Sequence, residues 1–351
     1  MNEVLMNYDF DRITIATLGS HSALNILKGA KDEGFRTVCV CRRNEKIIYE
    51  SFGVADVIVE INNFADLLNE RIQKKLIELN SILIPHGSFN AYLDSLDRIK
   101  VPIFGNKVLM IWEVDREKQS LWLRKAGLKI PKTYSTPEEI EGIAIVKYYG
   151  AKGGKGYFLI ANSDEFKEKL NKMIELGLVE KEVRDFQIQE YIVGTNIYFS
   201  FFNSLMFNRV ELISVDRRYE SNVDGIGRIP AGVQLKTDLI PTYTVTGNIP
   251  IVLREKFLEK AIKAAISVVE VSKEIAKPGL VGPFCLECVF DENEEMYVFE
   301  ISARIVAGTS VGIPVSPYSY ILFGENMYMG RRIAREIKLG IEKEKLGELI
   351  C

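Results

Sequence analysis

The 351-residue sequence predicts a mixed fold, in which an open, mostly parallel α/β domain is followed by an α+β region. Over the first hundred residues, short apolar runs alternate with segments of helical spacing, which is typical of a parallel sheet covered by helices. Beyond residue 140, apolar runs follow one another across short turns, which favours paired strands. The length suffices for two or three domains with sizeable cores.

The N-terminal elements follow from hydrophobic periodicity. Strands are predicted at residues 13–18, 37–41, 57–61, 81–85 and 101–104, and helices at 23–33 and 64–79. The second helix rests on a stripe of apolar residues at helical spacing, namely Leu67, Leu68, Ile72, Leu76 and Leu79. In such sheets, ligands bind beyond the carboxyl ends of the strands.

The later elements complete the predicted order. Helices are expected at residues 115–125, 164–176, 255–276 and 329–341, and strands around Lys147 and at 186–193, 197–202, 210–215, 280–290 and 296–301. Residues 216–234 are predicted to be a long polar loop, which in a compact enzyme is often functional. The expected domains are 1–107, which binds substrate, 108–195, a central lobe with a glycine-rich flap, and 196–351, a lobe with a metal site.

Composition narrows the class of protein. The net charge of -3 and the pI near 5.8 argue against a nucleic-acid partner held by bulk electrostatics. The sequence shows no apolar run of the roughly 20 residues that a membrane span needs and no signal peptide, so we expect a cytoplasmic protein without a membrane partner.

The five cysteines do not suggest a disulfide framework. Cys285 and Cys288 match C-x-x-C, but residues three apart on a strand point to opposite faces. A zinc site would need a second cysteine pair or a histidine cluster nearby in the sequence. We therefore expect buried structural cysteines.

A glycine-rich segment follows the strand of Lys147. It contains Gly150, Lys152, Gly153, Gly154, Lys155 and Gly156 before an apolar run resumes. Glycines let backbone N–H groups approach phosphate oxygens, and lysines neutralise their charge. The segment is not a Walker A motif, because no Gly-Lys-Ser/Thr opens a helix. It predicts a phosphate-covering flap; the alternative is a plain hairpin with solvated lysines.

Two glutamates lie within apolar strands joined by a turn. Glu287 and Glu300 would each be costly to bury unpaired, and a shared cation would resolve that cost. Mg²⁺ typically binds one or two carboxylates together with substrate phosphates. The alternative is an exposed face of an edge hairpin. Arg304, on the same strand face as Glu300, could neutralise a transferring phosphoryl group.

Both histidines of the chain follow predicted strands. His21 lies in Gly19-Ser-His-Ser22, which also opens a helix whose free N–H groups could hold a phosphate, and His86 follows the fourth strand. The alternative for each is a surface loop residue.

These features, in this order, resemble the ATP-grasp superfamily. The matching segments are Asp115-Arg116, Ala126-Gly127, Pro131, Lys147, the flap Gly150 to Gly156, Gln189 to Ile192, and Glu287 with Glu300. Arg116 replaces the usual lysine, and Ser302 replaces an asparagine. The resemblance implies that ATP is bound by Arg116, Lys147, Lys152, Gly153, Gly154, Gly156, Glu190, Tyr191, Ile192 and Glu220, that Glu287 and Glu300 hold Mg²⁺ or Mn²⁺, and that Lys147, Lys155 and Arg304 are catalytic.

The resemblance to the archaeal PurP family is closer and covers nearly the whole chain. It rests on Ile15 to His21, Pro85 to Ser88, Arg218 to Asn222, Thr246 to Pro250, Gly282 to Phe284 and Arg332 to Lys338. This family formylates aminoimidazole carboxamide ribonucleotide (AICAR) with formate and ATP, through formyl phosphate, in IMP synthesis. The implied substrate-binding residues are His21, Ser22, His86, Ser88, Arg218 and Asn248. A higher homo-oligomer, such as a hexamer, is also implied.

One segment departs from the family pattern. Where the family has Ala-Arg-x-Asp-Gly-Gly-Thr-Asn, this chain has Ala303-Arg-Ile-Val306-Ala307-Gly-Thr-Ser310. Two alternatives therefore stay open: an ATP-grasp ligase that joins a different acid or amine, and a nucleotide-binding regulatory protein without turnover.

Overall fold

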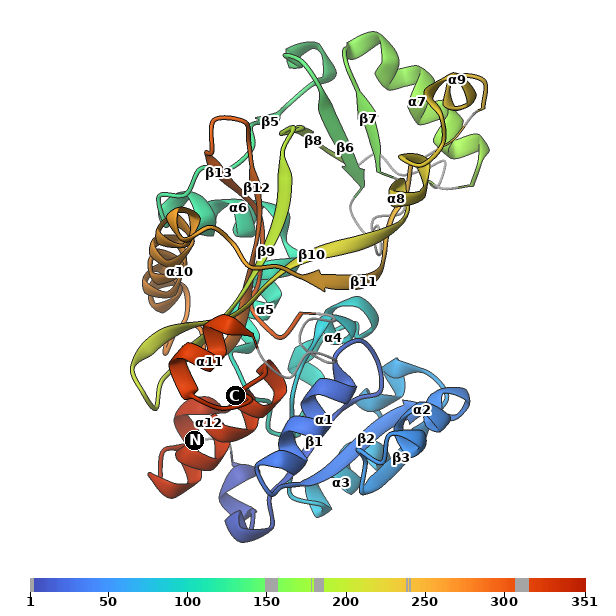
Figure 1. Cartoon of the computed structure of the whole chain (residues 1–351). Coiled ribbons are helices and arrows are strands. Elements are labelled where there is room, and N and C mark those ends of the chain that lie inside the picture. The colour runs from blue at the N-terminus through green and yellow to red at the C-terminus, as the bar shows by residue number, and fades with distance from the viewer. Residues whose placement is uncertain are drawn as a thin grey trace.

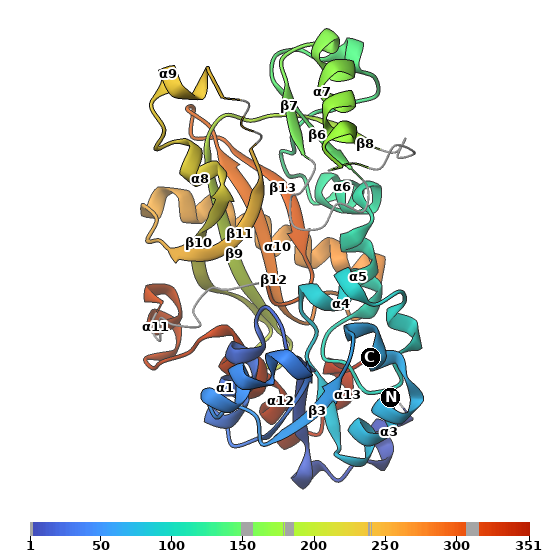
Figure 2. The ribbon, with the colours of Figure 1, turned by 90° about the vertical axis from the view of Figure 1, so that its right-hand side faces the viewer.

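The computed structural model describes residues 3–148, 157–177, 179, 186–237, 239, 241–306 and 316–351. It contains three sheets, with a parallel sheet at one end, a small antiparallel sheet at the other and a five-stranded antiparallel sheet between them (Figure 1 and Figure 2). The mixed α/β class that the sequence predicts is confirmed.

The N-terminal sheet is parallel throughout, with strand order β3-β2-β1-β4. Its elements are β1 (Thr14–Leu18), α1 (Ala23–Asp32), β2 (Arg36–Arg42), α2 (Lys46–Ser51), β3 (Val57–Ile61), α3 (Glu70–Glu78), β4 (Ser81–Leu83) and α4 (Gly87–Tyr92). The predicted strand at 101–104 forms isolated bridges instead, a parallel one between Leu83 and Ile103 and an antiparallel one between Phe104 and Ile350.

The prediction of a single helix at 64–79 is wrong. A short 3₁₀ helix (Phe64–Leu68) ends at Asn69, whose backbone is extended, and α3 begins at Glu70. The Asn63–Asp66 capping box begins the 3₁₀ helix, and the extended backbone of Asn69 separates it from α3. The apolar stripe continues across the break, so periodicity alone did not reveal it.

The middle lobe holds the small sheet, with order β5-β8-β6-β7 and antiparallel pairing. It comprises α5 (Lys107–Val114), α6 (Arg116–Lys125), β5 (Thr133–Tyr134), β6 (Ala144–Tyr148), β7 (Phe158–Ile160), α7 (Ser163–Glu175) and β8 (Phe186–Glu190). Asp115 starts α6 by accepting hydrogen bonds from the N–H groups of Glu117 and Lys118, as a helix cap does.

The five-stranded sheet has order β11-β10-β9-β12-β13. The C-terminal elements are β9 (Thr195–Ser204), β10 (Arg209–Asn222), α8 (Val223–Ile226), α9 (Ala231–Gln234), β11 (Tyr243–Pro250), α10 (Glu255–Ile275), β12 (Gly282–Phe290), β13 (Met296–Ser302), α11 (Pro317–Phe323), α12 (Met329–Glu342) and α13 (Leu346–Leu349). Phe199, Phe201 and Leu286 share a buried cluster with the apolar stripe of α10, so α10 covers one face. Tyr198, Ser200 and Glu287 alternate onto the opposite face.

The prediction of a long polar loop at 216–234 is also wrong. β10 continues to Asn222, because Asp216 to Asn222 pair with β11, and α8 and α9 follow. Its polar residues therefore lie on an extended strand, where every second one faces the same side.

The C-terminal helix packs against the N-terminal lobe. α12 lies beside α1 (Figure 1), and Ile333 and Ile337 join Ile26 in one buried cluster. All five cysteines are free, and Cys285 and Cys288 are buried, as expected. Within the described ranges, no helix is long and apolar enough to cross a membrane.

Candidate active site

The two glutamates singled out in the sequence face each other across β12 and β13. Glu287 and Glu300 are directly paired in the antiparallel register, which places both side chains on one face of the sheet. Glu287 is 1% exposed, and its Oε2 has no hydrogen-bond partner among the described residues. The exposed-hairpin alternative is therefore wrong for Glu287, and its unpartnered oxygen fits a cation ligand.

Arg218 is the partner of the other Glu287 oxygen. Its Nη2 donates to Oε1 at 2.5 Å, and its guanidinium lies 4.1 Å from the centre of the Tyr198 ring. Burial raises the pKa of Glu287 to about 7; Arg218 opposes this shift and the charge of Glu300 adds to it. The sequence missed this pair, because Arg218 is far from Glu287 in the chain and was expected in a loop.

Lys147, on β6 of the middle lobe, lies close enough to the same carboxylates for their charges to act on it. Its Nζ donates to Oε1 of Gln189 at 2.8 Å and lies 5.6 Å from the centre of the Phe299 ring. Burial lowers the pKa of Lys147 to about 8, with Arg116 acting in the same direction and Glu300 and Glu287 opposing them. The site therefore lies between two sheets.

Arg116, at the start of α6, bridges two strands of the middle lobe. Its guanidinium donates to Gln187 Oε1 and to the Tyr157 hydroxyl, both at 3.2 Å. Tyr157 ends the glycine-rich segment. The predicted contacts Lys152, Gly153, Gly154, Lys155 and Gly156 lie outside the described residues.

The segment Glu190 to Ile192, called the hinge from here on, follows β8 beside β5 and β6. The Glu190 carboxylate accepts a hydrogen bond from the Lys132 N–H at 3.0 Å, so this side chain supports the main chain. The Tyr191 N–H donates to the Ile143 carbonyl. On β11, burial raises the pKa of Tyr243 to about 12, and Tyr191 and Glu220 add to the shift.

Glu220 lies on β10, with its backbone N–H bonded to the Asp224 carboxylate. Burial raises the pKa of Glu220 and Asp224 adds to the shift, while Arg218 opposes it. On β11, Asn248 pairs in register with Arg218. Glu220 and Asn248 are thus brought to the strand pair that carries Arg218.

Arg304 is held by a buried glutamate that the sequence did not reveal. Its Nε and Nη2 lie 3.0 and 2.9 Å from Oε1 of Glu113, and Oε2 of Glu113 accepts the Ala303 N–H at 2.6 Å. Burial raises the pKa of Glu113, while Arg304 opposes the shift. Glu113 ends the apolar run of α5, so a charge within an apolar helix was the available signal.

The loops after β1 and β4 meet the end of β13. The Ser22 hydroxyl donates to the Val306 carbonyl at 2.7 Å, and Ser88 donates to Ser20 at 2.9 Å. His86 forms a parallel bridge with Ile305. His21 is exposed with a positive φ of 31°; partial desolvation, with the charges of Arg304 and Arg218, lowers its pKa.

His86 differs from His21 because it is fully buried. Its Nε2–H donates to the Leu18 carbonyl at 2.9 Å, and its Nδ1 accepts the Ser88 N–H at 3.3 Å. Burial lowers its pKa to about 3, so the ring is neutral. Both ring nitrogens are occupied, so His86 positions the two loops. The family resemblance had implied that it contacts the substrate.

Comparison with known proteins identifies the family. Two family models match, described as "Domain of unknown function (DUF1297)" over residues 165–351 and "Protein of unknown function (DUF1246)" over 15–134. A protein of Archaeoglobus fulgidus named 5-formaminoimidazole-4-carboxamide-1-(beta)-D-ribofuranosyl 5'-monophosphate synthetase is 64% identical, over 99% of this chain and 97% of its own length.

Solved structures agree. The "IMP biosynthesis protein PurP" from Thermococcus kodakaraensis matches with a TM-score of 0.74 and 28% identity, over 96% of this chain and all of that one (100%). A biotin carboxylase from Campylobacter jejuni, an ATP-grasp enzyme, matches with a TM-score of 0.65 and 14% identity, over 92% of this chain and 70% of that one, and shows the fold alone. The chain belongs to the PurP family of 5-formaminoimidazole-4-carboxamide ribonucleotide synthetases, with an ATP-grasp fold.

Proposed function

We propose that this protein is an ATP-dependent ligase that formylates AICAR with formate and releases ADP and phosphate. The observation that carries the proposal is the buried face of the five-stranded sheet. There, Glu287 and Glu300 lie near the charge of Lys147 from the middle lobe. A loop of the N-terminal lobe bonds to the segment that follows β13.

ATP would lie between the middle lobe and this sheet. Lys147 and Arg116 provide positive charge for its phosphates, and the hinge Glu190 to Ile192, with Glu220 nearby, provides the base and ribose contacts. Lys152, Lys155 and the neighbouring Gly153, Gly154 and Gly156 would cover the phosphates. Phosphoryl transfer depends mainly on positioning and charge neutralisation, which these groups supply.

Glu287 and Glu300 would hold Mg²⁺ or Mn²⁺. The buried, unpartnered Oε2 of Glu287 supports this assignment, because an isolated carboxylate oxygen in the interior is costly without a cation. A bound divalent cation would neutralise the charge of the ATP phosphates. Arg218 is the residue whose ion pair with Glu287 must adjust when the cation binds.

The ribonucleotide would lie at the loops after β1 and β4. His21, Ser22 and Ser88 are at these loops, the charge of Arg218 acts on His21 from the neighbouring sheet, and Asn248 is the register partner of Arg218. In this arrangement a formate oxygen attacks the γ-phosphorus, ADP leaves, and formyl phosphate forms. The amine of the aminoimidazole then attacks the formyl carbon, phosphate departs, and the amine loses a proton.

The experiment is a product assay with omissions. ADP and the formylated ribonucleotide should form together only when ATP, Mg²⁺, formate and AICAR are all present. Glu300→Gln should lower kcat by at least about 100-fold, since the cation loses a charged ligand. Equal ADP release without formate, or a fully active Glu300→Gln variant, would contradict the proposal.

A second candidate is a ligase with another acid or amine. Val306, which replaces the family's aspartate, lies next to Ser22 and lines a small pocket with Arg304. A panel of short carboxylates and amino ribonucleotides tests it: this candidate predicts faster ADP release with another pair than with formate and AICAR. A regulatory protein would instead bind ATP and the ribonucleotide without turnover in the same assay.

The proposal includes an oligomeric state. We expect a cytoplasmic homo-oligomer, such as a hexamer, on the basis of the family resemblance. Light scattering coupled to size exclusion measures the mass directly, and a mass near the 39.8 kDa of one chain would contradict it.

A further inference from the structure

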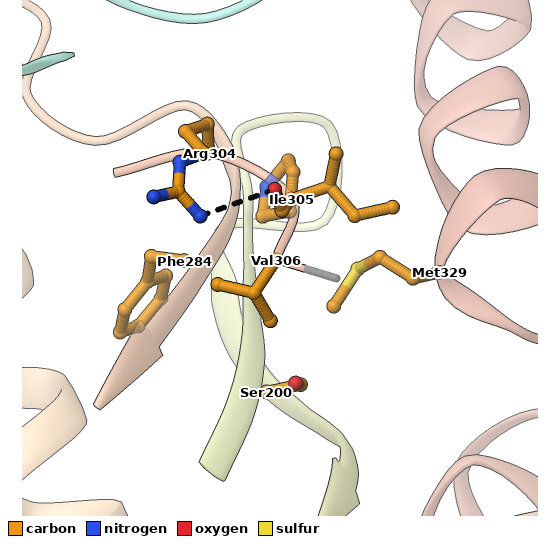
Figure 3. Close-up of a pocket in the computed structure, with 7 residues that line it drawn as sticks. Ser200, Phe284, Arg304, Ile305, Val306 and Met329 are labelled. Carbon is orange, nitrogen blue, oxygen red and sulfur yellow. Dashed lines mark hydrogen bonds between the residues drawn. The ribbon is translucent and has the colours of Figure 1, made fainter. Parts of the chain in front are cut away.

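A small pocket lies beside Arg304, at the end of β13 (Figure 3). It encloses about 10 Å³ and is lined by Ser200, Pro283, Phe284, Arg304, Ile305, Val306 and Met329. Such a volume is about that of one water molecule, so formate, with three heavy atoms, fits only when the walls move slightly apart. The pocket combines one cation, one hydroxyl and an otherwise apolar wall.

The hydroxyl belongs to Ser200, on the face of the sheet that carries Glu287. Ser200 is opposite Cys285 in the register, two residues before Glu287 on β12, and thus about 7 Å along the strand from it. The side chain is 2% exposed, and among the described residues its Oγ has no hydrogen-bond partner. A buried hydroxyl without a partner is expected to have one when a ligand is bound.

The guanidinium of Arg304 has donors to spare. It carries five N–H groups. Nε and Nη2 each use one on Glu113, and Nη1 uses one on the Ile305 carbonyl. The remaining N–H groups of Nη1 and Nη2 lie on the outer edge of the guanidinium, where they can bind both oxygens of a carboxylate.

The pocket lies between the expected ATP site and the expected ribonucleotide site. On one side is the Glu287–Glu300 pair on β12 and β13. On the other side, Ser22 bonds to Val306 and Gly87 approaches the guanidinium, since a Cβ at Gly87 would lie 3.7 Å from Cζ of Arg304. An acid held here would lie between the phosphates of ATP and the ribonucleotide.

We propose that this pocket is the acid subsite of the ligase, in which Arg304 and Ser200 bind the carboxylate of formate and Val306 and Met329 exclude larger acids. The inference rests on the proposed function and deepens it. Formate has no side chain, so it displaces the pocket walls less than any other carboxylate. Acetate adds a methyl group that must fit against Val306 or Met329.

The first test is kinetic. Ser200→Ala should raise the KM for formate about tenfold or more, because a hydrogen bond to a charged oxygen is lost, and leave the KM values for AICAR and ATP nearly unchanged. Ser214→Ala is the matched control. Ser214 pairs with Ser200 in register, is equally buried and has an Oγ without a partner in the described part of the chain, but it does not line the pocket.

The control should leave the formate KM unchanged. Equal effects of Ser200→Ala and Ser214→Ala, or an effect of Ser200→Ala on AICAR instead of formate, would overturn the proposal. Val306→Ala should widen the pocket and raise the ratio of acetate-supported to formate-supported ADP release severalfold. An unchanged ratio in Val306→Ala would also count against the subsite.

A binding measurement separates this inference from the proposed function. The NMR line of ¹³C-formate should broaden with the wild-type chain, ADP and Mg²⁺, and broaden less with Ser200→Ala than with Ser214→Ala. If no formate-dependent ADP appears but this difference does, the proposed function fails and the subsite stands. If turnover requires formate and the two variants behave alike in both assays, the subsite fails and the function stands.

Discussion

At the scale of single residues, the site is built from buried charges that have protein partners. Glu287 pairs with Arg218, and Arg304 pairs with Glu113. Lys147 differs, because the hydrogen bond at its ammonium goes to the neutral amide of Gln189. Its charge is therefore only partly compensated, in agreement with its lowered pKa.

Lys147 gives the pH prediction. With a pKa of about 8, it is protonated below pH 8 and loses its charge above it. ATP binding favours the protonated form, so affinity for ATP should fall above pH 8, by up to about tenfold per pH unit. Calorimetric titration with ATP between pH 7.5 and 9.5 measures this.

The matched control is Lys147→Arg, whose guanidinium stays charged throughout this range. It should flatten the pH dependence even if affinity at pH 7.5 is lower; an unchanged slope would assign the titration to another group. The sign for stability is opposite to that for ATP. Because the unfolded lysine has the higher pKa of about 10.4, the unfolded state binds more protons between pH 8 and 10.4, and this residue's destabilising effect lessens as pH rises there.

The sequence predicts Lys147, Glu287, Glu300 and Arg304 as members of one site, and in the structure the charges of Lys147 and Arg304 lie near the two glutamates. It did not predict that Arg218, Glu113 and Gln189 are their partners, although it named Arg218 and Gln189 for other roles. A buried ion pair is visible in a sequence only when both charges lie within apolar patterns, and Arg218 lies in a polar stretch. Contacts between positions 42 to 191 residues apart, as these are, leave no local periodicity.

At the scale of elements, the close packing of α1 against α12 joins the two ends of the chain. A Cβ at Gly29 would lie 2.1 Å from the Arg331 backbone N, and one at Gly330 would lie 2.1 Å from the Asn25 carbonyl oxygen. The Gly330 N–H also donates to Oδ1 of Asn25 at 2.5 Å. The two glycines thus allow backbone contact between helices.

Gly29→Ala tests this contact. The added methyl group meets backbone atoms, so we expect a loss of about 2–3 kcal/mol in the free energy of unfolding. Gly232→Ala in α9 is the control, because a Cβ there meets nothing within 4 Å; it should be neutral or slightly stabilising. Denaturant unfolding measures both, and equal stabilities for the two variants would refute the close contact.

The errors in element prediction have a common cause. The polar stretch 216–222 is a strand because it pairs with β11, and the run 64–79 breaks at Asn69, whose backbone is extended. Alternation of burial, which identifies most strands, is weak where one face lines a site. Strand pairing and local backbone conformation decide the secondary structure of such segments.

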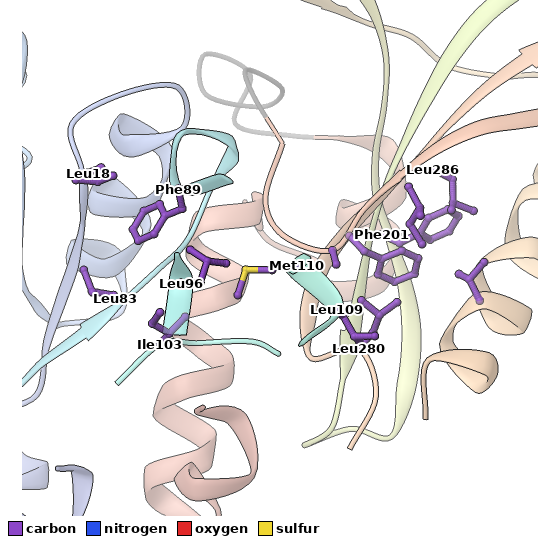
Figure 4. Close-up of a cluster of buried hydrophobic side chains, with 14 of the residues drawn as sticks. Leu18, Leu83, Phe89, Leu96, Ile103, Leu109, Met110, Phe201, Leu280 and Leu286 are labelled. Atoms are coloured by element: carbon purple, nitrogen blue, oxygen red, sulfur yellow. The ribbon is translucent and has the colours of Figure 1, made fainter. Parts of the chain in front are cut away.

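At the scale of the whole molecule, the cores cross the expected domain boundaries. One buried cluster extends from Leu18 and Phe89 in the N-terminal lobe to Phe201 and Leu286 in the five-stranded sheet (Figure 4). The division into 1–107, 108–195 and 196–351 therefore remains a prediction about folding units.

A fragment experiment tests the first unit. Residues 1–107 alone would expose the α1 face that α12 covers, so we expect no cooperative unfolding transition from this fragment. The same fragment joined by a flexible linker to residues 326–351 should recover one. Circular dichroism during heating measures both, and a cooperative transition in 1–107 alone would show that it folds without α12.

The sequence by itself determined the mixed fold, the order of most strands and helices, and the paired glutamates, and it predicted a lysine for the phosphates. These follow from local periodicity and from the cost of burying charge. Only the tertiary structure decided that Arg218 lies on Glu287, that Glu113 orients Arg304, and that Ser200 lines a pocket with Val306. These depend on register and on packing between distant segments, which no local pattern encodes.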